Sequence, residues 1–167
     1  FIEGINADNL LDAEPHGRNP VLADALKRIG LAERTGRGID RIYEGSLLYG
    51  RLLPDYSRST STSVRLFIPR GMPDRAFVRM ISEEQQRLGH PLPIYALLVL
   101  NTLKQMHQAT LREISEALKR DESRIKIVVE TLVESGLVEA IGNGRGRNYM
   151  LSPKAYGREN TAAYIRQ

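Results

Sequence analysis

The chain has 167 residues, of which 41% are hydrophobic and 26% charged, a composition typical of folded domains rather than disordered segments. It has no cysteine, which excludes disulfides, thiolate catalysis and cysteine zinc sites and leads us to expect a cytoplasmic protein. No apolar run approaches the roughly 18 residues of a membrane helix, so we expect no membrane partner. The formal net charge of +4 lies mostly in residues 72–167, where it permits a nucleic-acid partner without requiring one.

Residues 1–71 predict two helices and one strand. Asn19 and Pro20 are typical of a helix start, and Gly30 marks the end of that helix. A second helix is expected from the sequence GIDRIYEG onward. The apolar, β-branched segment 63–69 predicts a strand, which needs partner strands from earlier in a longer chain because a single strand is not stable alone. The absence of an initiator Met agrees with the view that this sequence is a fragment.

The second half predicts three helices followed by a hairpin. Apolar residues recur at helical spacing over 76–88 and 93–106, and Thr110 with Glu113 gives the pattern of a capping box before the next helix. Another helix is expected over 122–135. The sequence LVEAI–GNGRG–RNYMLS then predicts a β-hairpin, with positive φ values at the asparagine and the glycine of its Asn143–Gly144 pair.

This order of elements is that of a winged helix-turn-helix, in which the outward side of one helix enters the major groove of DNA. At 100° per residue, the inward side of the helix over 122–135 holds Ile125, Val128, Val129 and Leu132. The candidate DNA-binding residues lie on the other side or at its edge, and they are Ser123, Arg124, Lys126 and Ile127. Glu122 and Glu130 argue against DNA because carboxylates repel phosphate. A protein-interaction or dimerisation module, in which this side is simply solvated, therefore remains open.

The predicted hairpin turn carries Arg145 and Arg147 and no acidic residue. A glycine-rich turn needs its glycines for geometry, but any polar residue would serve where the two arginines stand. Two guanidinium groups on such a turn suit a wing that contacts the phosphate backbone or the minor groove of duplex DNA. Tyr149 is expected to anchor the second strand rather than to stack on a base.

The blocks GRNPVLADALKRIGLAERTGRGIDRI and SVRLFIPRG resemble the C-terminal region of bacterial RecG-like ATP-dependent DNA helicases and transcriptional regulators. Proteins of that kind carry a Schlafen/AlbA-type (divergent AAA-4) domain at their N-terminus and end in a winged helix. The resemblance covers residues 1 to about 71 and extends more loosely over the winged helix. The chain has no P-loop motif.

The same region is similar to the ATPase fold of sensor histidine kinases, gyrase and Hsp90-type chaperones. On this resemblance RTGRGID is the glycine-rich element before a helix, and Thr35, Gly36 and Gly38 are candidate nucleotide-binding residues. The residues that hold magnesium and read adenine would precede Phe1, so ATP and Mg²⁺ could bind only together with an upstream domain. The alternative is that the glycines allow close packing of the helix on a sheet.

No set of residues in the sequence predicts a catalytic or metal site. The three histidines are scattered, the serines of 57–63 lie in a polar loop, and the acidic pair Glu83–Glu84 is expected on an exposed helix surface. ATPase activity would require the upstream residues.

The sequence therefore predicts an α+β protein with four parts. Residues 1–71 form the C-terminal part of an ATPase-like α/β domain, 72–92 a linker helix, 93–153 the winged helix-turn-helix and 154–167 a C-terminal tail. The favoured function is a DNA-binding transcriptional regulator with duplex DNA as partner. The alternatives are the C-terminal piece of a nucleotide-dependent helicase-like protein, and a protein-interaction module that forms a homo-oligomer.

Overall fold

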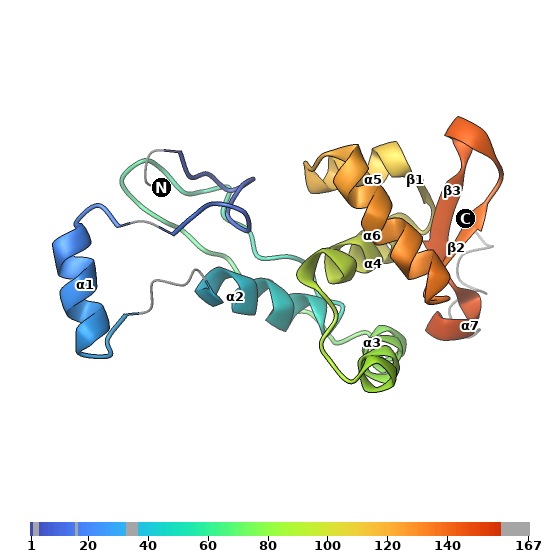
Figure 1. Cartoon of the computed structure of the whole chain (residues 1–167), viewed down its shortest axis with the longest axis horizontal. Helices are drawn as coiled ribbons and strands as arrows, with labels where there is room; N and C mark the ends of the chain where they lie inside the picture. The colour runs from blue at the N-terminus through green and yellow to red at the C-terminus, as the bar shows by residue number, and fades with distance from the viewer. Residues whose placement is uncertain (2–3, 16, 33–36, 158–167) are drawn as a thin grey trace. The chain divides into compact units, whose positions relative to one another are not determined.

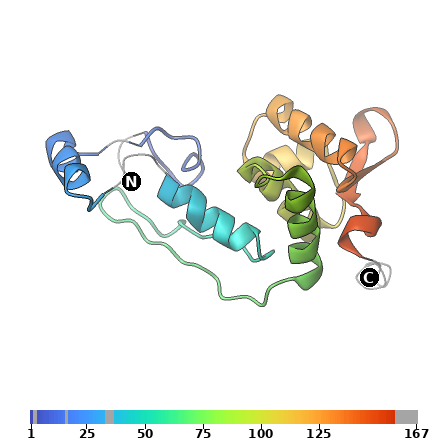
Figure 2. The same ribbon diagram turned by 60° about the horizontal axis from the view of Figure 1, so that its bottom comes forward.

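The computed structural model describes residues 1, 4–15, 17–32 and 37–157, without the side chain of Arg145. The chain divides into two compact units, shown in two views in Figures 1 and 2. Unit 1 comprises Phe1–Ser46 and Leu52–Gly71, and unit 2 comprises Leu47–Arg51 and Met72–Gln167. Each is described by itself.

Unit 1 contains the helices α1 (Pro20–Arg28) and α2 (Arg37–Leu47). The predicted start of α1 is confirmed, since the Asn19 side chain accepts a hydrogen bond from the backbone N–H of Leu22 at 3.0 Å. No residue of α1 is buried, and its apolar residue Val21 is 80% exposed. Figures 1 and 2 both show α1 standing apart from α2.

The small core of unit 1 is aromatic. Tyr43 of α2 stacks on Tyr56, with ring centroids 6.5 Å apart, and the ring of Phe1 lies 6.2 Å from that of Tyr56 at an interplanar angle of 46°. The strand predicted over 63–69 is not present: Phe67 makes a single antiparallel bridge with Asp55, and the flanking apolar residues are exposed. The physical reason is that the described part of unit 1 offers this segment no neighbouring strand.

Unit 2 combines helices with a small antiparallel sheet. Its elements are α3 (Arg75–Leu88), α4 (Ile94–Met106), β1 (Ala109–Thr110), α5 (Leu111–Leu118), α6 (Glu122–Glu134), β2 (Val138–Ile141), the 3₁₀ turn η1 (Gly144–Gly146), β3 (Asn148–Leu151) and α7 (Pro153–Tyr156). The strand order is β1-β3-β2, with Val138 opposite Leu151 and Ala109 opposite Tyr149. The mixed α+β class predicted from the sequence is thus observed.

The core of unit 2 is built around α4, which packs against α5, α6 and β3. The prediction of the inward side of α6 is confirmed, because Ile125, Val129 and Leu132 are buried. Val128 is only half-buried.

Two details of the sequence interpretation are wrong. Glu84 is 6% exposed rather than on an open surface, because α3 turns this side toward the rest of unit 2. In the hairpin, Asn143 has φ −132° and the positive φ values lie at Gly142 and Gly144, since the turn is longer than two residues and contains the 3₁₀ segment.

Asp74 joins four segments of unit 2. Its Oδ1 accepts a hydrogen bond from the Phe77 backbone and so caps α3, while its Oδ2 accepts one from the Tyr156 hydroxyl at 2.6 Å. Lys104 of α4 lies 3.6 Å from Asp74 Oδ2 and donates a hydrogen bond to the carbonyl of Gly50. Partial burial alone would raise the pKa of Asp74, but these hydrogen bonds and the lysine charge outweigh it, so the pKa lies below its ordinary value.

We expect Asp74→Ala to lower the free energy of unfolding by about 2 kcal/mol, because it removes a helix cap and two further contacts to a charged group. Asp74→Asn should cost less, since asparagine also caps helices. The lowered pKa means that the contribution of the charge is complete above the unfolded value near pH 4 and is lost as the pH falls through the folded pKa. Denaturant unfolding between about pH 7 and pH 3 measures this loss. An equal loss of stability on acidification in the wild type and Asp74→Asn would contradict it.

Candidate nucleic-acid interface

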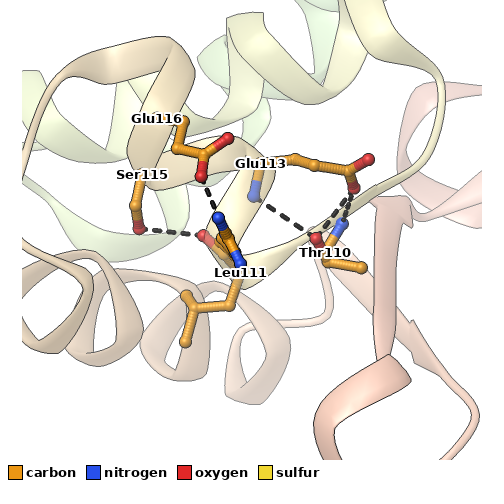
Figure 3. Close-up of polar contacts among 6 residues, drawn as sticks. Thr110, Leu111, Glu113, Ser115 and Glu116 are labelled. Atoms are coloured by element: carbon orange, nitrogen blue, oxygen red, sulfur yellow. Dashed lines mark hydrogen bonds and ion pairs between the residues drawn. The ribbon is translucent and has the colours of Figure 1, made fainter.

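The start of α5 is fixed by the predicted capping box, which is confirmed (Figure 3). The carboxylate of Glu113 accepts hydrogen bonds from the Thr110 backbone N–H and hydroxyl, at 2.7 and 2.8 Å, and the Thr110 hydroxyl accepts one from the Glu113 backbone. Ser115 donates to the carbonyl of Leu111 at 2.8 Å. The same close-up shows Glu116, which accepts a hydrogen bond from the guanidinium of Arg112 on the exposed side. These contacts fix where β1 ends and α5 begins.

The turn between α5 and α6 brings Asp121 to the start of α6. Lys119 ends α5 with φ 51°, and the Asp121 side chain then accepts hydrogen bonds from the hydroxyl and the backbone N–H of Ser123. These two bonds, the hydroxyl first, lower the pKa of Asp121. The Ser123 hydroxyl is therefore already a donor within the protein, and it has only acceptor capacity left for a ligand.

Arg124 and Arg120 both contact Tyr95, which lies at the start of α4. The guanidinium of Arg124 lies over the tyrosine ring, 4.2 Å from its centroid, and Nε of Arg120 donates to the tyrosine hydroxyl at 3.1 Å. Arg124 thus makes a cation–π contact with α4 although its side chain is exposed. Tyr95 has no local signal in the sequence, because only the fold brings it to the end of α5 and the start of α6.

The outward side of α6 carries a nearly balanced set of charges. Lys126 forms an ion pair with Glu130 at 3.8 Å, and both side chains are more than half exposed. Such exposed pairs are weak, so the lysine can exchange Glu130 for phosphate or a base edge at little cost. Ile127, also predicted to contact DNA, is 67% exposed.

The β2–β3 hairpin presents Arg147 just before β3. Its guanidinium lies 5.7 Å from the ring centroid of Tyr149, and Tyr149 itself is 7% exposed in β3. The expectation that Tyr149 anchors the strand is confirmed by this burial. The side chain of Arg145 lies outside the described part of the structure, so its contacts stay a prediction.

The candidate nucleotide-binding residues lie mostly outside the described residues. Thr35 and Gly36 are in that undescribed part, whereas Gly38 is the second residue of α2. A Cβ atom built on Gly38 would meet no atom within 4 Å, so nothing in the described structure requires glycine there for close packing.

Among the residues that the structure describes, no three His, Asp or Glu side chains come together as metal ligands. None of the helices that the structure describes is long and apolar enough to cross a membrane.

Comparison with known proteins finds a similarity for the first part of the chain. Residues 1–68 match the protein-family model described as "Putative ATP-dependent DNA helicase recG C-terminal". No curated protein matches the chain.

A solved structure, that of the DIP2311 protein from Corynebacterium diphtheriae, is similar in fold, with a TM-score of 0.65 and 20% sequence identity. The similarity covers 97% of this chain and 32% of the other, so the chain spans about a third of the length of that relative.

We expect Arg124→Ala to lower the stability of the protein by about 0.5–1 kcal/mol, because it removes the cation–π contact of an exposed arginine with Tyr95. Lys126→Ala, which removes an exposed ion pair two residues further on, should change it by less than about 0.5 kcal/mol. Urea denaturation of both variants measures the difference. Equal effects would show that Tyr95 does not hold Arg124.

Proposed function

We propose that this chain is the C-terminal piece of a nucleotide-dependent, RecG-like helicase-type protein. The observation that carries the proposal is the family match over residues 1–68, in a unit that leaves its apolar surfaces uncovered. Helix α1 buries no residue, and Phe67 and Ile68 are more than half exposed. Surfaces of this kind usually pack against other elements of the same domain.

The missing elements would come from residues upstream in the longer protein. They would complete the sheet beside the 63–69 segment and cover the apolar side of α1. On the resemblance to histidine-kinase-type ATPases, the upstream part would hold Mg²⁺ and the adenine of ATP. Thr35, Gly36 and Gly38 would then offer backbone N–H groups to the phosphates at the start of α2. A Schlafen/AlbA-type domain further upstream belongs to the same proposal.

The longer protein should bind a fluorescent ATP analogue in the presence of Mg²⁺, and the 167-residue chain alone should not. In the longer protein, Gly38→Asp should weaken nucleotide binding at least about tenfold, because it places a carboxylate near the phosphates. Gly45→Asp, in the same helix and also exposed with no atom within 4 Å of a built Cβ, is the matched control and should bind normally. A longer protein that binds no nucleotide would contradict the proposal.

We further infer that unit 2 is a winged helix-turn-helix that contacts duplex DNA. The order α4-β1-α5-α6-β2-β3 and the sheet order β1-β3-β2 support this, since in such a fold α6 enters the major groove and the β2–β3 hairpin is the wing. Ser123 and Lys126 would meet base edges or phosphates, and Arg145 and Arg147 the backbone. Arg124 would act indirectly, by fixing α6 on α4. Such a unit suits a helicase-type protein and equally a transcriptional regulator.

Replacing Arg145 and Arg147 together by alanine should weaken binding to all duplex sequences and reduce the salt dependence by about two phosphate contacts. Arg79→Ala is a control that also removes one exposed arginine, from α3 rather than from the hairpin. It should leave the affinity for DNA and its salt dependence unchanged. Lys126→Ala should instead alter preference at one base position by roughly 1–3 kcal/mol. Fluorescence anisotropy with duplex DNA at two salt concentrations measures each effect. If the double variant loses thermal stability but not affinity, the hairpin is structural only.

A further inference from the structure

Unit 2 contains an apolar groove of about 530 Å³, and of its lining residues only Ile127 is also a candidate for DNA contact. It lies between the end of α3, the start of α4 and one side of α6. Its apolar walls are formed by Leu88, Leu92, Ala96, Ile127, Val128 and Leu132. A groove of this size lined by apolar side chains on a protein surface is typical of an interaction site.

The groove has a floor and a projecting side chain. Leu92, Ala96 and Leu132 are buried and form the floor, with exposed fractions of 7%, 6% and 2%. Ile127 belongs to the same wall but is 67% exposed. The surface therefore has both a concave apolar floor and a protruding apolar side chain, Ile127, that would fit such a floor on another molecule.

The charged residues of the groove are also of both signs. Arg87 makes two hydrogen bonds of 2.7 Å to the buried carboxylate of Glu84, which uses two of the five N–H groups of its guanidinium. The Arg87 side chain is 59% exposed, so its remaining N–H groups can reach a second carboxylate. Glu134 is exposed and lines the groove from α6.

We propose that this groove is the contact surface of a homodimer, in which Ile127 of each chain inserts into the groove of the other. A two-fold axis brings every surface feature onto its counterpart in the second copy, so a stable pairing requires self-complementarity. This surface meets the requirement twice: Ile127 would meet the Leu92–Leu132 floor, and Arg87 would meet Glu134.

Sedimentation of the 167-residue chain up to about 1 mM, the weak end of specific association, should show a dimer. Ile127→Asp should raise the dissociation constant at least about tenfold, because it places a carboxylate in an apolar socket. Ile29→Asp is the matched control: Ile29 lies in unit 1, is 66% exposed, and should leave the dimer unchanged. A monomer at all concentrations overturns the proposal. So does a dimer that Ile29→Asp dissociates and Ile127→Asp does not, which would locate the contact on unit 1.

A charge exchange tests the pairing of Arg87 with Glu134. Arg87→Glu and Glu134→Arg alone should each weaken the homodimer, because each creates two like-charged pairs across the two-fold axis. An equimolar mixture of the two variants should form a heterodimer that is tighter than either homodimer. One variant then has two acidic residues at these positions and the other has two basic ones, so both contacts across the two-fold axis are again between opposite charges. Glu134 is exposed, so Glu134→Arg should fold normally, whereas Arg87→Glu also removes the partner of the buried Glu84 and should lower stability. Thermal unfolding of both variants verifies that each is folded at the temperature of the association measurement. A mixture that associates no better than the separate variants overturns this geometry.

Discussion

Helix α4 is buried along most of its length, and the packing of unit 2 follows from enclosing it. Its residues Ala96–Asn101 and Leu103 are all buried, so apolar groups point in every direction rather than along one stripe. A helix of this kind must be covered on all sides. Helices α5 and α6 and strand β3 provide that cover, and each keeps its other side for solvent or a partner. Asn101 is the polar exception, since its Oδ1 is buried with no hydrogen-bond partner in the structure.

The features that were predicted correctly depend on residues close together in sequence. The capping box needs only Thr110 and Glu113, three positions apart, and the inward side of α6 needs only its helical period. The turn residues predict the hairpin correctly, but the positive φ expected at Asn143 is wrong. The conformation of Asn143 depends on where the 3₁₀ segment lies within the turn, and the Asn143–Gly144 pair alone does not determine that. The burial of Glu84 and the role of Tyr95 depend on which helices meet, and no local pattern contains that information.

In unit 1 the local sequence pattern is that of regular structure, but the described residues provide no neighbouring elements for it to pack against. The 63–69 segment has the composition of a strand, yet only Phe67 pairs, with Asp55. Strand formation requires hydrogen bonds from a neighbour, which composition cannot supply. Helix α1 has a normal cap and a defined apolar side but buries nothing. These segments thus have the apolar residues of a domain interior, but those residues are exposed to solvent.

The two tasks proposed for α6 use neighbouring parts of its outward side. Lys126 and Ile127 are adjacent in sequence, but successive residues of a helix differ by about 100° around its axis. Ile127 lines the groove and Lys126 does not. The residues proposed for DNA are at the start of α6, whereas Glu134 is at its end, about 16 Å from Ser123 at 1.5 Å per residue. A second copy in the groove would meet Ile127 and leave Lys126, about 100° away around the axis, open, while Ser123 would lie beside the contact, one turn before Ile127 on the same side. In that arrangement the dimer contact would fix the separation of the two proposed DNA-binding surfaces, so the geometry of Ile127 and Arg87 would determine the spacing of the sites that Lys126 would read and the hairpin arginines would hold by their phosphates.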